Sequence, residues 1–155
     1  MITIKDKKPV NEIQTEPARK GIQNKRAKFG EYMTVNACNG SSDLGQLTGA
    51  IANAIRDKVP NAFVDCPYAL FGDVDGPAQV ILHADYRIIF DGCKSRCLAK
   101  AFENVGAKVT LSYAMDEDFG FEKNPQPAKY SDEQVQIVVD KVLNDLQKLG
   151  LLKNS

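Results

Sequence analysis

The chain has 155 residues, which suits one domain with a single hydrophobic core. Apolar residues make up 43% and charged residues 26%, and 20 Lys and Arg balance 20 Asp and Glu. This zero formal net charge removes the long-range attraction to nucleic acid or an anionic membrane, so we expect neither as a partner.

The first 30 residues are basic and contain few large apolar side chains. They hold eight Lys and Arg against three Asp and Glu, and they lack a clear apolar period. We therefore expect residues 1–30 to form a flexible basic arm, partly disordered. Such an arm is usually solvated, and binding of an acidic protein partner is the alternative that the charge leaves open.

The first half of the domain alternates between strand and helix patterns. Residues 32–37 alternate apolar and small side chains, which predicts a first strand. Leu44, Leu47, Ile51 and Ile55 recur at helical spacing, so a helix is expected to end near Val59-Pro60. A short apolar run at residues 62–65 predicts a second strand.

The same alternation continues beyond a glycine-bracketed loop at residues 71–76. A short helix is expected at residues 77–83, followed by a third strand at 86–90 whose continuous apolar run is typical of burial on both faces. A helix is predicted from Cys93 to Val105, ended by Gly106, and a fourth strand at residues 108–113.

The last predicted helix has the clearest boundaries. Ser131 is a favourable N-cap, Gln134 completes a capping-box pattern, and Gly150 marks the end. Residues 151–155 follow as a C-terminal tail. Because strands and helices alternate throughout residues 31–150, we predict a single three-layer α/β domain with a mostly parallel sheet.

The cellular setting bears on the chemistry of the four cysteines. No segment reaches the roughly 18 apolar residues of a membrane span, and the N-terminus lacks the pattern of a secretory signal. We therefore expect a cytoplasmic protein, in which thiols stay reduced. Cysteines in that compartment more often bind metal or perform redox chemistry than form disulfides.

All four cysteines follow predicted strands. Cys38 ends the first strand and Cys66 the second, while Cys93 follows the third, with Cys97 four residues later. Ligand sites of open α/β sheets lie outside the carboxyl ends of the strands. We therefore predict that the four thiols form one site at that edge, rather than serving as four small buried apolar side chains.

Metal binding is favoured over a disulfide between Cys93 and Cys97. In a helix their Cβ atoms would lie about 5–6 Å apart, whereas a disulfide needs about 3.8 Å. The sulfurs around tetrahedral zinc are roughly 3.8 Å apart, which side chains from adjacent turns can reach. Four thiolates saturate zinc and describe a structural site, and an iron–sulfur cluster is also compatible with four cysteines.

Four segments of the chain, which include every cysteine, resemble the DGC-domain family. They are Cys38-Asn-Gly-Ser-Ser-Asp-Leu-Gly-Gln46, Cys66 with Phe71-Gly-Asp-Val74, Ile88-Ile-Phe-Asp-Gly-Cys-Lys-Ser-Arg-Cys97, and Phe119-Gly-Phe-Glu-Lys123. The family is described as zinc-binding and is named for its Asp-Gly-Cys triplet. The resemblance covers about residues 33–148, and it implies zinc ligands at Cys38, Cys66, Cys93 and Cys97 with no established reaction.

Two departures accompany this resemblance. Asn39 follows the first cysteine where serine is expected, and residues 1–30 lie outside the similar region. Four residues are expected to support the ligands: Ser41, Asp73, Asp91 and Gly92. For Asp91 and Asp73 a capping or turn role is the competing interpretation.

An enzyme is the alternative to a metal-binding protein. In that interpretation Cys38, at the start of a helix, is the nucleophile of a thiol oxidoreductase or transferase, and a second cysteine resolves it. The chain lacks Cys-x-x-Cys, and its single histidine, His83, precedes the third strand and is expected far from the thiols. Leu44-Gly45-Gln46 also lacks the Gly-Lys-Ser/Thr of a phosphate-binding loop.

Overall fold

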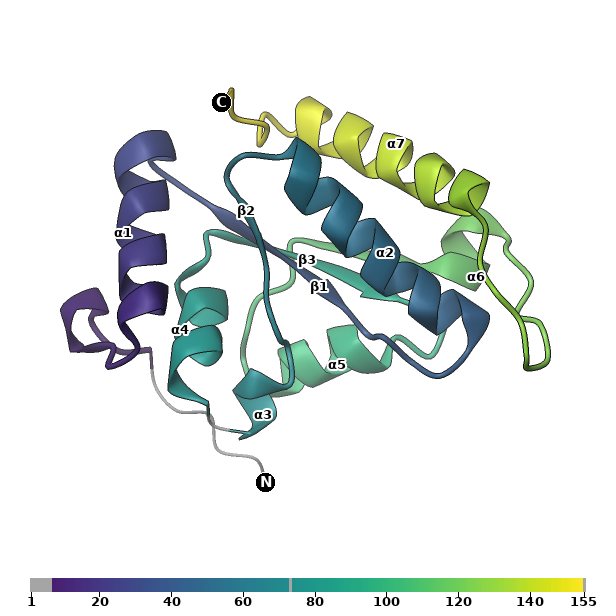
Figure 1. The fold of residues 1–155 in the computed structure, drawn as a ribbon, viewed down its shortest axis with the longest axis horizontal. Helices are drawn as coiled ribbons and strands as arrows, with labels where there is room; N and C mark the ends of the chain where they lie inside the picture. Colours follow the sequence, from purple (N-terminus) through teal and green to yellow (C-terminus); the bar gives the residue numbers. More distant parts are fainter. Residues whose placement is uncertain (1–6, 73, 155) are drawn as a thin grey trace.

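A four-stranded sheet with helices on both faces forms the framework of the protein (Figure 1). The computed structural model describes residues 7–72 and 74–154. The three-layer α/β domain predicted from the alternating pattern is confirmed.

All pairs of strands in the sheet are parallel. Its members are β1 (Met33–Ala37), β2 (Ala62–Val64), β3 (Tyr86–Asp91) and β4 (Leu111–Ala114), in the order β2-β1-β3-β4. Val35 of β1 lies between Val64 of β2 and Ile88 of β3. The chain leaves β1 toward one edge and returns to β3 on its other side, so the carboxyl ends of β1 and β3 flank the topological switch point.

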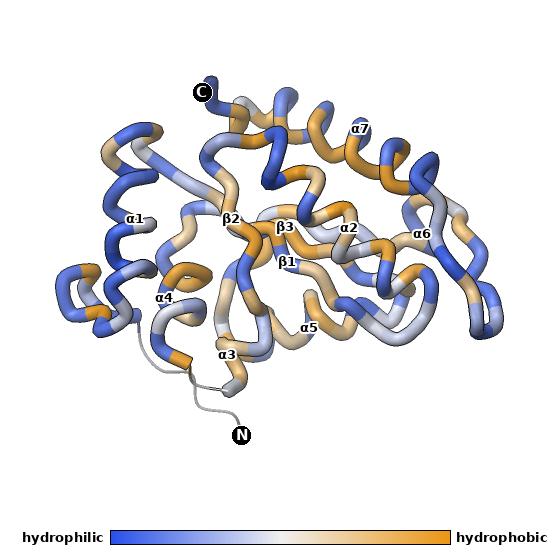
Figure 2. Tube along the Cα trace, in the orientation of Figure 1, coloured by the Kyte–Doolittle hydropathy of each residue, from blue (hydrophilic) through white to orange (hydrophobic). Residues whose placement is uncertain are grey.

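Two long helices cover one face of the sheet. They are α2 (Asp43–Lys58) and α7 (Asp132–Lys148), which pack side by side in Figure 1, and the short α6 (Met115–Phe119) lies near their ends. Leu47 and Ile51 of α2 and Val138 and Val142 of α7 are fully buried against the strands. In Figure 2, apolar and hydrophilic segments alternate along both helices. The predicted capping box joins Ser131 and Gln134 at the start of α7.

Shorter helices cover the other face. They are α3 (Ala69–Gly72), α4 (Asp75–His83) and α5 (Cys97–Asn104). Leu70, Ile81 and Phe102 from these helices surround Ile89 of β3 in a second apolar cluster. Because both faces of β3 are buried, its continuous apolar run is explained.

The N-terminal segment differs from the expectation of a partly disordered arm. Residues 10–12 form a 3-10 helix, η1, and Glu16–Phe29 form α1, which lies beside α4 (Figure 1). Ile13 and Ile22 are fully buried against Tyr32 and Val80. Two isoleucines give too weak a periodicity to predict this helix, but their burial is sufficient to hold it on the domain. The structure does not describe residues 1–6.

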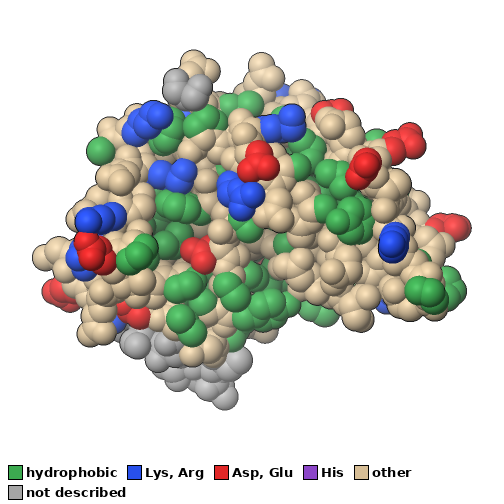
Figure 3. Space-filling model, in the orientation of Figure 1, with side chains coloured by type: hydrophobic (Ala, Val, Ile, Leu, Met, Phe, Trp, Pro, Cys, Tyr) green, Lys and Arg blue, Asp and Glu red, His purple; other side chains and the backbone are tan. Residues whose placement is uncertain are grey.

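No helix within residues 7–72 and 74–154 has the length and hydropathy needed to cross a bilayer. On the face shown in Figure 3, basic and acidic side chains are interspersed.

Candidate functional site

A cavity of about 330 Å³ opens at the carboxyl ends of β1 and β3, at the topological switch point. Three of the four cysteines line it: Cys38, Cys93 and Cys97. The other lining residues come from the loop after β1, the first turn of α2, the Asp91-Gly92 pair and two side chains from elsewhere, Tyr68 and Lys123. Three of the four cysteines that were predicted to share one site thus lie around the same cavity.

Cys66 does not line this cavity. It lies on the segment between β2 and α3, and its side chain is exposed. All four cysteines are free thiols. Among the residues that the structure describes, no three His, Cys, Asp or Glu side chains converge closely enough to hold a metal ion.

The loop after β1, residues 38–42, and the first turn of α2 form one wall of the cavity, and side chains of these two segments hold it in place. The Cys38 N–H donates to the Phe90 carbonyl at 3.0 Å, which holds the loop's start against β3. The Ser42 hydroxyl accepts from the Gly45 N–H at 3.0 Å and so caps α2. Gln46 donates from its side chain to the Gly40 carbonyl at 2.7 Å. Ser41, expected to support the ligands, lines the cavity with an exposed side chain.

A threonine touches the Cys38 sulfur. The Thr48 hydroxyl donates to the Gly45 carbonyl at 2.6 Å and lies 3.7 Å from the sulfur. Because this single hydroxyl proton is committed to Gly45, the thiol of Cys38 is the donor toward Thr48.

Asp91 is a capping residue for α5. One carboxylate oxygen accepts from the Leu98 N–H at 2.9 Å and the other from the Ala99 N–H at 3.1 Å. Burial raises the pKa of Asp91, and these two N–H groups act in the opposite direction. Asp91 thus fixes the start of the helix that carries Cys97, which agrees with the capping interpretation of its role.

The helix after β3 begins later than predicted. Residues 93–96 form a turn closed by the Arg96 N–H and the Cys93 carbonyl at 3.0 Å, and α5 starts at Cys97. Arg96 has φ 49° and ψ 46°, a left-handed conformation that stops helix propagation from Cys93. Cys93 is therefore not helical, and the expected helical i, i+4 spacing of Cys93 and Cys97 is wrong.

The Arg96 side chain holds this turn against β4 and α6. Its guanidinium donates to the Ser112 hydroxyl at 2.9 Å, to Glu117 at 3.0 Å and to Asp118 at 2.9 Å. Sequence reasoning missed the structural role of Arg96. The left-handed turn that aims Arg96 has no signal in the residue pattern.

Tyr68 connects the Cys66 segment to the cavity. Its hydroxyl donates to the Cys38 carbonyl at 2.6 Å. Partial burial raises the pKa of Tyr68, and the charges of Cys38, Cys66 and Asp91 raise it further. This residue, which the sequence analysis also missed, links the segment that bears Cys66 to the backbone of Cys38.

Lys123 reaches the cavity because the segment that bears it is held by a buried carboxylate. Asp43, 2% exposed, accepts from both the backbone and side-chain N–H groups of Asn124. The structure thus brings residues from three of the four family-like segments to the cavity, whereas Cys66 and Phe71, of the remaining segment, do not line it. Asp73, expected to support the ligands, lies outside the described residues.

The single histidine lies away from the thiols, as expected. His83 ends α4 beside the amino end of β3, and its Nε2 lies 2.6 Å from the Lys8 carbonyl oxygen.

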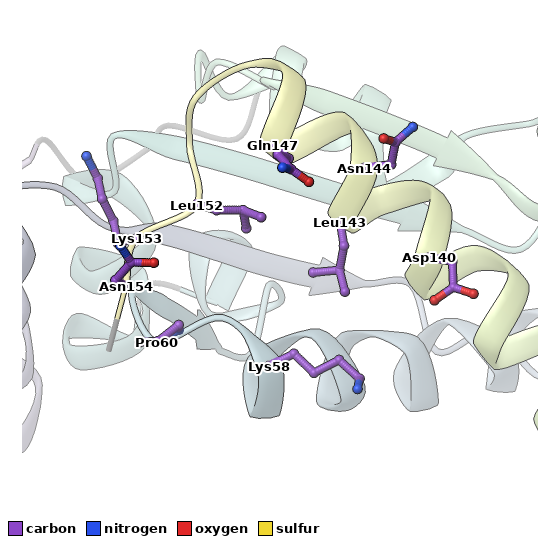
Figure 4. A pocket seen from close by; sticks show the side chains of 9 residues that line it. All are labelled: Lys58, Pro60, Asp140, Leu143, Asn144, Gln147, Leu152, Lys153 and Asn154. Atoms are coloured by element: carbon purple, nitrogen blue, oxygen red, sulfur yellow. The ribbon is translucent and has the colours of Figure 1, made fainter.

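A second cavity, of about 460 Å³, lies between the end of α2, α7 and the C-terminal residues (Figure 4). It contains no cysteine, and the length of α2, roughly 22 Å, separates it from the thiols.

Comparison with known proteins identifies one family. The model of the DGC domain matches residues 34–142, which includes all four cysteines and the whole cavity wall. No curated protein matches the chain. No solved structure matches it either.

Proposed function

Because the chain belongs to the DGC-domain family, we propose that its four cysteines bind one zinc ion, in a structural or zinc-handling role. The ligands in this proposal are Cys38, Cys66, Cys93 and Cys97. Asp91 and Gly92 hold the ligand-bearing loops in place, and the cytoplasm, where thiols remain reduced, is the proposed location.

One observation carries the proposal. Thiols from the loop after β1 and the loop after β3 line the same cavity at the switch point of the sheet. Thiols are the ligands that zinc prefers in structural sites, and this cavity has no histidine and one buried carboxylate. That carboxylate, Asp91, already accepts two backbone N–H groups, which leaves the sulfurs as the available donors.

Positive ends of helices and one lysine lie around this cavity. Cys38 precedes the N-terminus of the 16-residue α2, and Cys97 begins α5, so both lie at the positive ends of helix dipoles. Lys123 adds a positive charge to the cavity wall. When bound, zinc would cross-link the loops after β1 and β3, and Cys66 would join them through movement of its exposed segment.

Elemental analysis of natively purified, anaerobic protein tests this proposal. We expect about one zinc per chain, lost when any one of the four cysteines is replaced by serine. Ser95→Ala, in the same turn as Cys93, is the matched control and should retain the metal. Protein that contains no stoichiometric metal and whose unfolding is insensitive to a chelator would overturn the proposal. Iron together with acid-labile sulfide would indicate an iron–sulfur cluster in place of zinc.

A thiol oxidoreductase or transferase that uses Cys38 as nucleophile is the second candidate. The observation that favours it is the position of Cys66 outside a cavity lined by three thiols. If the protein is an oxidoreductase, two cavity thiols are oxidised to a disulfide while a substrate disulfide is reduced to two thiols. Metal-free protein in which Cys38 reacts with iodoacetamide much faster than the other cysteines would support this candidate, and equal rates at all four would exclude it.

A further inference from the structure

The N-terminal segment, residues 7–30, lies outside the family-matched region and contacts α4 through polar groups. The Lys8 ammonium pairs with Asp75 at 2.6 Å, and the other Asp75 oxygen accepts the Gln14 N–H at 3.1 Å. The backbone of Lys8 bonds to Gln79 and His83 at 2.9 and 2.6 Å. These groups fix the first and last turns of α4, which lie beside α1 in Figure 1.

The same segment also contacts β2, the strand at the edge of the sheet. The Lys25 ammonium donates to the Pro60 carbonyl at 2.8 Å and lies 4.5 Å from the centre of the Phe63 ring. Gly21 packs so closely on that ring that a Cβ atom would lie 3.3 Å from it. Tyr32, just beyond α1, meets Phe63 edge-on with ring centres 5.3 Å apart.

The chain between these two points of contact carries Cys66. It runs from β2, which has three residues and pairs only with β1, through the four-residue α3 to α4. The Cys66 N–H bonds to the adjacent Asp65, and its carbonyl bonds to Ala69, so its backbone bonds are local. Beyond the apolar contacts of α3, the hydrogen bond from the Tyr68 hydroxyl to the Cys38 carbonyl links this segment to the cavity.

We propose that residues 7–30 position Cys66, by holding both β2 and α4, and so determine whether the fourth thiol can join the cavity. The inference rests on the proposed zinc site for its functional consequence, but the positioning itself can be measured without metal. Lys8 is the positioning residue to change, because its ion pair with Asp75 is mostly shielded from solvent, with side chains 26% and 18% exposed.

The test compares Lys8→Met, which keeps the aliphatic stem and removes the charge, with Lys141→Met. Lys141 pairs with Asp145 on α7 at the same 2.6 Å, away from β2 and α4, so it is the matched control. Lys8→Arg restores the charge. In the first measurement, amide hydrogen exchange is followed in residues 62–72 of metal-free protein; in the second, cobalt is added and its thiolate charge-transfer absorption is recorded.

We expect roughly two- to fivefold faster exchange of residues 62–72 in Lys8→Met, no change there in Lys141→Met, and recovery in Lys8→Arg. With cobalt, the absorption spectrum of Lys8→Met should resemble that of Cys66→Ser more closely than the spectrum of the unmodified protein does. Unchanged exchange in Lys8→Met, or equal acceleration in Lys141→Met, would overturn the positioning role. If the unmodified protein binds no cobalt, the zinc proposal fails, and hydrogen exchange still decides the positioning role.

Discussion

Gly92 packs against Gly45 so closely that a Cβ atom on Gly92 would lie 2.8 Å from the Gly45 backbone nitrogen. Gly45 in turn meets the Gly40 backbone, where its own Cβ would lie 2.5 Å from the carbonyl oxygen. The first turn of α2 therefore packs backbone to backbone against the loop after β1 on one side and the loop after β3 on the other, beside the thiols. The glycine of the Asp-Gly-Cys triplet is required by this contact, and its backbone freedom is not the reason.

Replacement of Gly92 by alanine should destabilise the protein. The added methyl group meets backbone that cannot turn aside, so we expect a loss of about 1–3 kcal/mol in the free energy of unfolding. Chemical denaturation measures it. Gly72→Ala is the control, since a Cβ there has 3.8 Å to its nearest neighbour and should change stability little. Equal effects of the two substitutions would contradict the close contact.

Removal of the Asp91 carboxylate should loosen the start of α5. Asp91→Ala leaves the Leu98 and Ala99 N–H groups without their acceptors, with an expected loss of about 1–2 kcal/mol. Hydrogen exchange in residues 97–102 should accelerate, and Cys97 alkylation with it. Ser131→Ala removes a comparable cap from α7 and should leave Cys97 unaffected. An unchanged alkylation rate of Cys97 in Asp91→Ala would show that the Asp91 cap does not control the accessibility of Cys97.

Two substitutions at Arg96 isolate the cost of its left-handed backbone. Both Arg96→Ala and Arg96→Gly lose the bonds to Ser112, Glu117 and Asp118. Glycine adopts φ 49° without the steric penalty of a Cβ, so Arg96→Gly should be more stable than Arg96→Ala by about 1 kcal/mol. Thermal denaturation compares them. Greater stability of the alanine variant would show that this turn does not persist in solution.

Stability should fall on acidification because of His83. Burial lowers the pKa of His83, with Lys7 and Arg26 contributing in the same direction and the Lys8 carbonyl opposing them. The folded state therefore resists protonation of His83. The contribution of neutral His83 to stability is present above its unfolded pKa of about 6.5, and it is lost as the pH falls through its pKa in the folded state.

The expected effect of His83 is a lower free energy of unfolding at acidic pH. It is measured as the difference in unfolding free energy between pH 7.5 and 5. His83→Gln retains a donor for the Lys8 carbonyl and should remove this part of the pH dependence. The same slope in His83→Gln would assign the acid sensitivity to other groups.

Two helices in the second half of the chain, α7 and α5, show which helix boundaries a local sequence pattern can predict. The α7 boundaries follow from Ser131, Gln134 and the apolar spacing, because a capping box acts within one helical turn. The predicted helix from Cys93 fails for the opposite reason. Its true start depends on Arg96, whose partners lie 16–22 residues away, and on Asp91, which caps α5 from the end of β3.

The parallel α/β architecture and the position of the cysteines after three strands could be predicted from periodicity and chain order, which are local properties. The folded chain adds that Cys38, Cys93 and Cys97 line one cavity while Cys66 lies outside it, and that residues 16–29 form a packed helix. Those outcomes depend on contacts between distant segments, such as Ile22 with Val80 and Gly45 with Gly92, whose energies no local pattern contains.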